Sequence, residues 1–427
     1  MFLDNLKNIY KSIFSISIIW FSSLLNGIIV FSTNILLAKY IGIEEFGYFY
    51  SIITFAIIAG SIAGFGAPGF LLNIFSSEGI IAVKWISVLV KYIFITSFFS
   101  IILFLFSSFF LSLELKFYYI IFFSFNVLSF ISTDICVAKF QLKNDSLSIA
   151  RWQLFSSFYK FLSILILFFL LNNYNTILIL FIFSFISLLH FILSIKQLLS
   201  IRSPLFKSNF NIPKKKFFLR KNLTIENIFR KTWLYGFISL FYLVYTQSNI
   251  ILTKYFLGDR EAGLYAIAFT FLLPIFLIPS VVYQKYFLPK FMFWSHNNMN
   301  KLIVNHYKIN SVMIPVSLLI LTGVWIVFPF IINLIFSSEY LYLKKLLLIL
   351  SMCIPFRFAS AGWAALFSSG TYVISLFKIM FFAVILNFTA NIMLIPVFGL
   401  FGAAYAAILT EFMICLLFYI NYKIYFK

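Results

Sequence analysis

The chain has 427 residues, of which 63% are hydrophobic and only 10% charged, and its mean hydropathy is +1.04. Soluble domains carry about 25% charged residues, so this composition excludes a soluble globular protein. Many apolar runs are long enough to cross about 30 Å of hydrocarbon as helices, and they lack the short alternating segments of an outer-membrane barrel. We therefore expect an all-α integral membrane protein.

Charges and turn residues divide the chain into twelve apolar segments, which predict about twelve transmembrane helices. The segments run near residues 12–37, 46–72, 86–112, 117–138, 154–171, 175–195, 233–253, 262–284, 309–335, 346–369, 372–395 and 400–421. Six precede a hydrophilic stretch and six follow it, which predicts two parallel halves that enter the membrane in the same direction. We expect an N-terminal lobe at 1–195, a basic cytoplasmic linker at 196–231 and a C-terminal lobe at 232–427.

The distribution of basic residues predicts the orientation of the chain. With a cytoplasmic N-terminus, 25 of the 32 Lys and Arg residues fall on the cytoplasmic side and 6 on the outer side, while Arg357 lies within a span. Positive charge is enriched on the cytoplasmic side of membrane proteins, so we expect both termini there. The net charge of +20 then reflects topology and attraction to anionic lipid headgroups, and it gives no reason to expect nucleic-acid binding.

Two stretches half a chain apart, 34–50 and 249–266, resemble each other. With one inserted residue, Asn34 aligns with Asn249, Lys39 with Lys254, Tyr40 with Tyr255, Gly42 with Gly258, Glu45 with Glu261, and Gly47 with Gly263. Self-similarity at half the chain length predicts a duplicated unit. Each copy is expected to form the outer end of a first helix, a short turn that its glycines shape, and the start of a second helix.

The repeated lysines and asparagines are candidate substrate-binding residues. Lys39 and Lys254 are each followed by acidic residues, so local ion pairs are one interpretation. The other interpretation makes them a symmetric basic pair at the outer mouth of a central cleft. Asn34 and Asn249, five residues earlier in each copy, would then offer neutral hydrogen-bonding groups on a similar side of the same helices.

Helix-breaking residues occur in matching segments of the two halves. The second segment contains the stretch 59–70, AGSIAGFGAPGF, with Gly64 and Pro68, and its counterpart contains Pro274 and Pro279. Small residues allow close helix packing, and a proline frees a backbone carbonyl one turn back. Close packing and a hinge are both compatible with this pattern, and its presence in both halves favours a hinge.

Ionisable residues within spans are costly unless they face a cavity or a partner. Arg357 lies about 17 Å into the tenth segment at 1.5 Å per residue, near mid-membrane, and Glu411 lies near the middle of the twelfth. The two could form a structural ion pair. Alternatively, Arg357 holds an anionic group bidentately while Glu411 takes up and releases a proton. Asp134 is a weaker candidate for coupling to H+ or Na+, and Lys160 is expected to snorkel to a helix end.

The sequence offers no sign of catalysis. It contains no nucleophile with an adjacent base, no metal-ligand spacing and no phosphate-binding glycine loop. Its three cysteines are far apart and lie within apolar runs, at positions 136, 353 and 415. We therefore expect a protein that is not an enzyme and that has no metal or cofactor.

Three motifs carry a resemblance to a known family. They are LAKYIGIEEFGYFY at 37–50, LTKYFLGDREAGLYAIA at 252–268 and NFTANIMLIPVFGLFGAAYAAILTE at 387–411. With its twelve expected spans, the chain resembles the Wzx-type polysaccharide (O-antigen) flippases of the multidrug/oligosaccharidyl-lipid/polysaccharide exporter (MOP) superfamily. One departure is Ser248, where such flippases often have an Asp.

The resemblance implies a MATE-like fold and a flippase in the bacterial inner membrane. Its substrate would be an undecaprenyl-diphosphate-linked oligosaccharide, an O-antigen (lipopolysaccharide) or capsule precursor, moved from the cytoplasmic to the periplasmic leaflet by alternating access. Arg357 would contact the diphosphate, and the polymerase and chain-length machinery of polysaccharide assembly would be partners. A cation-coupled multidrug exporter of the same superfamily, a peptidoglycan-precursor flippase and a membrane-embedded polysaccharide polymerase remain alternatives.

Overall fold

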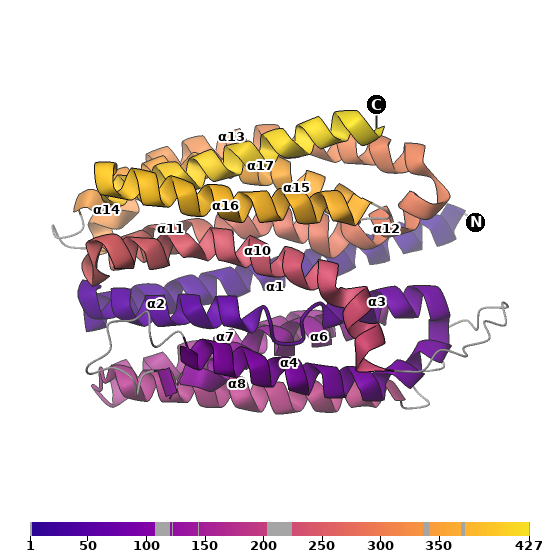
Figure 1. The fold of residues 1–427 in the computed structure, drawn as a ribbon, viewed down its shortest axis with the longest axis horizontal. Helices are drawn as coiled ribbons and strands as arrows, with labels where there is room; N and C mark the ends of the chain where they lie inside the picture. The colour runs from indigo at the N-terminus through magenta and orange to yellow at the C-terminus, as the bar shows by residue number, and fades with distance from the viewer. Residues whose placement is uncertain are drawn as a thin grey trace. The chain divides into compact units, whose positions relative to one another are not determined.

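The computed structural model consists of helices joined by short turns (Figure 1). It describes residues 2–106, 120–121, 123–143, 145–202, 224–335, 341–368 and 372–426. Within these ranges no strand occurs. The predicted all-α fold class is therefore confirmed.

The chain forms two compact units, and three helices contribute to both. Unit 1 comprises Met1–Ser22 and Phe55–Leu240, and unit 2 comprises Ser23–Thr54 and Phe241–Lys427. The shared helices are α1 (Phe2–Ile41), α2 (Ile43–Gly60) and α10 (Ile225–Leu257). This grouping differs from the lobes expected at 1–195 and 232–427, whose boundaries stay a prediction.

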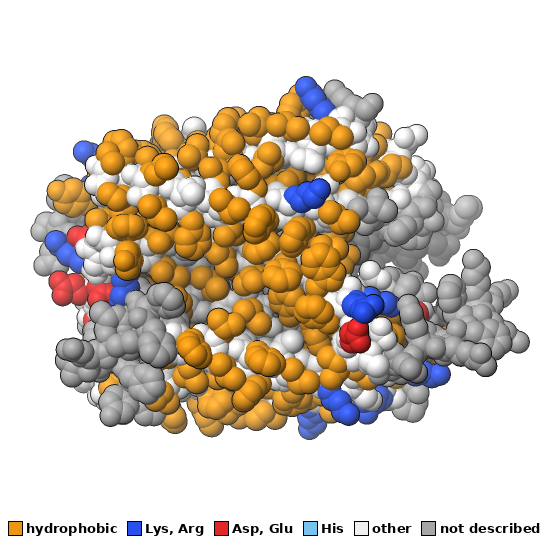
Figure 2. Space-filling view, viewed as in Figure 1, with side chains coloured by type: hydrophobic (Ala, Val, Ile, Leu, Met, Phe, Trp, Pro, Cys, Tyr) orange, Lys and Arg blue, Asp and Glu red, His pale blue; other side chains and the backbone are white. Residues whose placement is uncertain are grey.

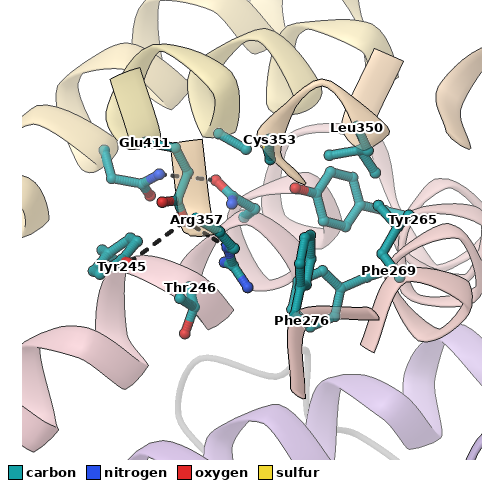
Figure 3. Close-up of a pocket in the computed structure, with 13 residues that line it drawn as sticks. Tyr245, Thr246, Tyr265, Phe269, Phe276, Leu350, Cys353, Arg357 and Glu411 are labelled. Atoms are coloured by element: carbon teal, nitrogen blue, oxygen red, sulfur yellow. Dashed lines mark hydrogen bonds and ion pairs between the residues drawn. The ribbon is translucent and has the colours of Figure 1, made fainter. Parts of the chain in front are cut away.

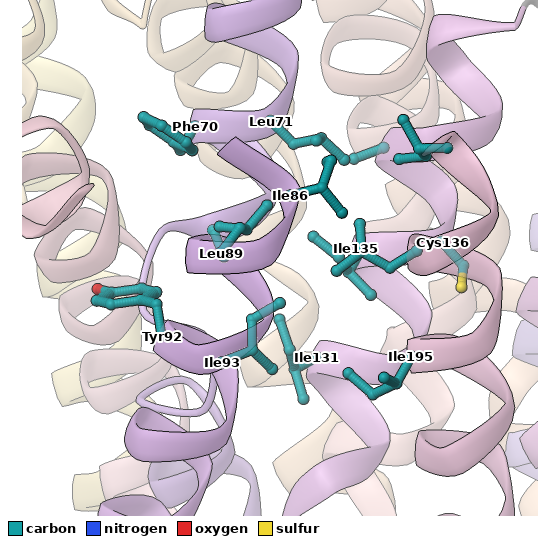
Figure 4. Packing of buried hydrophobic residues seen from close by; sticks show 14 of the residues in the cluster. Phe70, Leu71, Ile86, Leu89, Tyr92, Ile93, Ile131, Ile135, Cys136 and Ile195 are labelled. Carbon is teal, nitrogen blue, oxygen red and sulfur yellow. The ribbon is translucent and has the colours of Figure 1, made fainter. Parts of the chain in front are cut away.

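Unit 1 is built around a buried hydrophobic cluster, part of which Figure 4 shows. Its own helices are α3 (Ala67–Glu78), η1 (Gly79–Trp85), α4 (Ile86–Phe106), η3 (Ser124–Val127), α6 (Leu128–Leu142), α7 (Ser146–Leu165), η4 (Ile166–Leu170), α8 (Thr176–Leu199) and η5 (Ser200–Arg202). Ile86, Leu89 and Ile93 of α4 and Ile131 and Ile135 of α6 are almost fully buried in this cluster. Burial of these branched side chains in one cluster stabilises the packing of unit 1.

The second expected span, 46–72, is divided in two. Helix α2 ends at Gly60, a turn follows, and α3 begins at Ala67 with Pro68 in its first turn. Gly64 lies in this turn at φ 68°, and a Cβ added there would lie 2.1 Å from the Cδ1 of Ile131 in α6. The glycine-rich stretch thus permits close packing against α6, while a hinge at Gly64 and Pro68 stays a prediction.

Unit 2 contains most of the C-terminal half of the chain together with parts of α1 and α2. Its own helices are α11 (Asp259–Ser280), η6 (Val281–Phe287), α12 (Leu288–Asn297), α13 (Met299–Ile335), α14 (Leu341–Ser351), α15 (Cys353–Phe367), α16 (Val373–Phe398) and α17 (Leu400–Phe426). Helices α16 and α17 form an antiparallel hairpin about Gly399, at φ 59°. The helix α15 packs against α13 and α17, which places its side chains in the interior of the unit.

The two copies of the repeat adopt the same local structure. Helix α1 ends at Ile41 and α2 begins at Ile43, and the residue between them, Gly42, has φ 84°. In the second copy Gly258, at φ 104°, stands between α10 and α11. A positive φ is readily adopted only by glycine, which explains why both copies carry one at this position. The predicted helix–turn–helix is confirmed in both.

The two copies also contact each other within unit 2, through a second pair of equivalent glycines. A Cβ added at Gly47 of α2 would lie 1.9 Å from the carbonyl oxygen of Asp259. Conversely, a Cβ added at Gly263 of α11 would lie 2.5 Å from the carbonyl oxygen of Ile43. The contact is therefore reciprocal, and the backbones of α2 and α11 approach so closely that neither position has space for a side chain.

Eleven helical stretches in the described residues are long and apolar enough to cross a membrane. The remaining expected span, 117–138, overlaps α6 and also covers residues that lie outside the described ranges. Hydrophobic side chains cover most of the face in Figure 2, and few charged ones interrupt them along the helices. An apolar outer surface of this kind matches a hydrocarbon solvent. The chain is a multi-pass membrane protein, and the side on which its termini lie stays a prediction.

Candidate functional site

Arg357 and Glu411 form an ion pair inside unit 2. The Nε of Arg357 on α15 lies 2.6 Å from the Oε1 of Glu411 on α17, and the two side chains are 13% and 2% exposed. Removing two charges from water is costly, and the cost is offset only when they are paired and hydrogen-bonded. The sequence had singled out both residues as charges within apolar runs, and the structure brings them together.

The remaining contacts of Arg357 involve the face of its guanidinium group. Its Cζ lies 4.1 Å from the ring centroid of Phe276 and 5.9 Å from that of Phe269, both on α11. Within the described part of the chain, no residue bonds to its two Nη atoms. In Figure 3 these nitrogens point away from Glu411, between Thr246 and Phe276. The guanidinium group therefore keeps one edge available for a bidentate oxyanion.

Glu411 is incompletely satisfied. Its Oε1 accepts the bond from Arg357 and a long one, 3.5 Å, from the hydroxyl of Tyr245 on α10. Its Oε2 is buried and bonds to no described residue. A buried oxygen without a partner is unfavourable by about 1–3 kcal/mol, so such an atom in a native structure calls for an explanation.

A small cavity lies beside the ion pair. Side chains from α10, α11, α14, α15, α16 and α17 line it, among them Asn249, Tyr265, Cys353 and Asn387. It leaves about 20 Å³ for the centre of a water-sized molecule. A volume of that size accommodates about one water, or one oxygen of a phosphoryl group. The cavity therefore accepts a single polar atom next to the guanidinium group.

A buried amide network adjoins this cavity. The Oδ1 of Asn249 accepts hydrogen bonds from the Nδ2 of Asn387, at 3.2 Å, and from the Nδ2 of Asn391, at 2.7 Å. Ser248 donates to the Oδ1 of Asn387 at 2.7 Å, and the Nδ2 of Asn387 also donates to Thr410 at 3.2 Å. All five residues are neutral, and they join α10, α16 and α17. The sequence predicted a polar role for Asn249 but gave no reason to connect it with Asn387.

Asn249→Ala is expected to destabilise the protein by about 2–4 kcal/mol, because it leaves the Nδ2 groups of Asn387 and Asn391 without their shared acceptor. Ser248→Ala removes a single hydroxyl donor and is expected to cost about 1 kcal/mol. Apparent melting temperatures of the two variants in detergent provide the measurement. Equal melting temperatures would contradict the central place of Asn249 in the network.

The other residues of the repeat lie apart from the cavity. The Nζ of Lys254 is 2.6 Å from the Oδ1 of Asp259 and 4.1 Å from the ring centroid of Tyr48, so the local ion pair considered from the sequence exists in this copy. Lys39 is exposed in the last turn of α1. Asn34 is buried, and its Nδ2 lies 3.4 Å from the Oγ1 of Thr270. Their roles in substrate binding stay predictions.

Two charged residues of unit 1 were also considered from the sequence. Asp134 is exposed on α6, and its coupling role stays a prediction. The expectation that Lys160 snorkels is wrong, because its Nζ donates to the Oδ1 of Asn126 and, at 3.3 Å, to the Oγ of Ser129. A polar cluster on η3 and α6 thus keeps the lysine inside the unit, and sequence spacing alone could not show this.

The prolines predicted as hinge residues lie within α11. Pro274 and Pro279 are both inside the helix, which then widens into the π-helical turn η6. A proline has no N–H, so the carbonyls four residues earlier, those of Thr270 and Ile275, lose their α-helical donors. The helix nevertheless continues through both prolines to Ser280, so the structure shows no break at this segment. A hinge at Pro274 and Pro279 stays a prediction.

A bundle of membrane-spanning helices with a buried ion pair and a polar cavity is typical of membrane transporters. Solved structures of transporters share the fold. A MATE transporter in complex with MaL6 superposes with a TM-score of 0.71 at 11% identity, covering 96% of this chain and 95% of that one. The lipid II flippase MurJ, in an inward closed conformation, gives 0.66 at 18% identity, covering 95% and 87%. A MOP superfamily transporter from Pyrococcus furiosus gives 0.68 at 10% identity, covering 96% and 95%.

These likenesses establish the fold as that of the MOP superfamily transporters. The chain belongs to the polysaccharide biosynthesis protein family, whose model matches residues 12–284. No curated protein matches it in sequence. The family resemblance expected from the sequence motifs is confirmed.

Proposed function

We propose that this protein is a flippase for polyprenyl-diphosphate-linked oligosaccharides. It moves undecaprenyl-diphosphate-linked repeat units, precursors of O-antigen or capsule, from the cytoplasmic to the periplasmic leaflet of the bacterial inner membrane. Membership of the polysaccharide biosynthesis protein family supports a role in glycan assembly. The MOP fold supports transport by alternating access.

The observation that carries the proposal is the free edge of Arg357. A diphosphate presents pairs of oxygens that match the two Nη donors of a guanidinium group. The adjoining cavity has room for one of these oxygens. Glu411 holds the Nε edge, so the anion and the carboxylate bind different edges of the same cation.

The membrane potential favours this direction of transport. A cytoplasm-negative potential stabilises outward movement of an anionic headgroup by about 2.3 kcal/mol per charge per 100 mV, provided that no cation moves with it. A carboxylate in the cavity is also what a cation exporter uses, but here Glu411 is already neutralised by Arg357.

Deleting the gene and analysing the cell's lipids by mass spectrometry tests the function directly. We expect a polyprenyl-diphosphate-linked oligosaccharide to accumulate, because it is still made but no longer flipped, and re-expression of the wild-type protein should clear it. An unchanged lipid profile combined with increased sensitivity to cationic drugs would favour the multidrug exporter instead.

Binding of a soluble analogue tests the site. Geranylgeranyl diphosphate is a short polyprenyl diphosphate that can be added to the purified protein in detergent. We expect it to bind more tightly than geranylgeranyl monophosphate, and we expect geranylgeraniol to bind weakly, because each phosphoryl group removed takes away oxygens that Arg357 can hold. Equal binding of all three lipids would show that the tail alone is recognised.

A further inference from the structure

The ring of Phe276 is the closest contact of the Arg357 guanidinium face, at 4.1 Å from ring centroid to Cζ. Phe276 is 8% exposed and lies in α11, whereas Arg357 lies in α15. A ring stacked on a guanidinium group attracts it and leaves its in-plane N–H donors free. The ring therefore fixes the plane of the cation without competing for the oxygens that would bind its edge.

Two contacts together determine which edge of Arg357 is presented. Glu411 holds the Nε and Phe276 holds the face, so the Nη edge points away from Glu411, between Thr246 and Phe276 (Figure 3). Without the ring, the guanidinium group can rotate and bond to Glu411 with two nitrogens, since the Oε2 of Glu411 has no other partner among the described residues. Such a bidentate pair would occupy an Nη donor of Arg357 that an anion needs.

The segment that carries Phe276 is weakly held by its own helix. Pro274 and Pro279 flank the residue and remove two backbone hydrogen bonds, and η6 follows directly. On one side of this segment, Gly263 is fixed against α2. On the other side, Tyr283 of η6 donates to Asn310 of α13. A change in the backbone of α11 between Gly263 and Tyr283 would therefore fall mainly on the residues that hold Phe276 against Arg357.

We propose that Phe276 is a positioning residue for Arg357 and that the backbone of α11 between Pro274 and Pro279 thereby sets the anion affinity of this site. The inference rests on the proposed function, since it assumes that Arg357 binds the diphosphate. It adds that the anion affinity at Arg357 depends on the backbone conformation of α11 between Pro274 and Pro279. A transporter needs such a dependence, because it must bind its substrate in one conformation and release it in another.

Binding of geranylgeranyl diphosphate to variants of Phe276 tests the positioning role. Phe276→Leu is expected to weaken binding about three- to tenfold, and Phe276→Tyr is expected to stay within about twofold of wild type, because it keeps the ring. Phe271→Leu is the matched control, since Phe271 is also a buried phenylalanine of α11 but packs on Phe31 and Phe328. Each affinity is measured on protein that elutes as a single folded species.

The outcomes separate this inference from the proposed function. If Arg357→Ala abolishes binding while Phe276→Leu binds like wild type, the positioning role is overturned and the diphosphate site stands. If Arg357→Ala binds like wild type, the proposed site is overturned and this inference with it. If Phe271→Leu weakens binding as much as Phe276→Leu, the effect comes from general packing of α11, which also overturns the positioning role.

A double-mutant cycle tests the dependence on the proline-flanked segment. Pro279→Ala restores a backbone donor for the carbonyl of Ile275 and is expected to weaken binding by shifting the backbone that carries Phe276. Combined with Phe276→Leu, it is expected to add little, because the ring has already been lost. Pro329→Ala, within α13, is the control and is expected to have no effect. Additive losses in the double variant, or no loss in Pro279→Ala, would overturn the coupling between the α11 backbone and the anion affinity.

Discussion

Replacing Arg357 with Ala is expected to reduce surface glycan to a small fraction of the wild-type level and to weaken geranylgeranyl diphosphate binding by about ten- to a hundredfold. One charge-assisted hydrogen bond contributes about 1.5–3 kcal/mol, so the loss of even one of the two Nη donors accounts for a change of this size. Glycan at the cell surface and binding to the purified protein are the two measurements. Wild-type export by this variant would overturn the assignment of Arg357.

The same substitution also leaves Glu411 buried without its cation, which is unfavourable by about 3–5 kcal/mol. A loss of export by this variant alone therefore does not distinguish a missing anion site from a smaller amount of folded protein. The double variant Arg357→Met, Glu411→Gln removes both charges at similar volume, so its melting temperature is expected to recover. Its export is not expected to recover, because no anion-binding edge is present. A double variant that is stable and exports normally would mean that the ion pair is purely structural.

Gly47→Ala is expected to be among the most destabilising single-methyl additions in this chain. The added Cβ would lie 1.9 Å from the carbonyl oxygen of Asp259, and backbone atoms cannot move aside without shifting α2 away from α11. Overpacking of this kind costs about 1–3 kcal/mol, and a backbone obstacle favours the upper end of that range. The apparent melting temperature in detergent, followed by size-exclusion chromatography after heating, is the measurement.

Two further glycines provide the comparison. Gly263→Ala is expected to act in the same direction, because its Cβ would lie 2.5 Å from the carbonyl oxygen of Ile43 across the same contact. Gly323→Ala, in α13, would meet nothing within 4 Å. It is expected to be neutral or to stabilise the helix by about 0.5–1 kcal/mol. A Gly47→Ala protein that melts like the Gly323→Ala control would contradict the close approach of the two repeats.

Several features of the fold could be predicted from the chain alone. The expected segments 175–195 and 372–395 correspond to α8 and α16, because a hydrocarbon solvent demands an apolar run of a fixed length. Helix ends were less predictable. Helix α13 begins at Met299, whereas its apolar segment begins at 309, since a helix can continue into polar surroundings. The second segment is two helices, α2 and α3, and its turn falls within the helix-breaking stretch 59–70.

The candidate site was only partly visible in the sequence. Arg357 and Glu411 were identifiable because a charge within an apolar run is rare and needs a reason. Their separation in sequence does not reveal that they bond to each other, nor that Phe276 stacks on the cation. Asn387 had no such signal, because an asparagine in an apolar segment carries no charge, and its importance appears only in its four hydrogen-bond partners.

The amino-acid sequence by itself determined that this is a helical membrane protein with a duplicated helix–turn–helix, since hydrophobic length and local glycine conformation are properties of short segments. Tertiary structure alone decided that the two copies touch at Gly47 and Gly263, that Lys160 is held inside its unit and that Arg357 keeps one edge free. The physical reason is that these features depend on which helices pack together. In a chain this rich in interchangeable apolar residues, many pairings satisfy the same hydropathy pattern, and backbone approach and buried polar contacts distinguish between them.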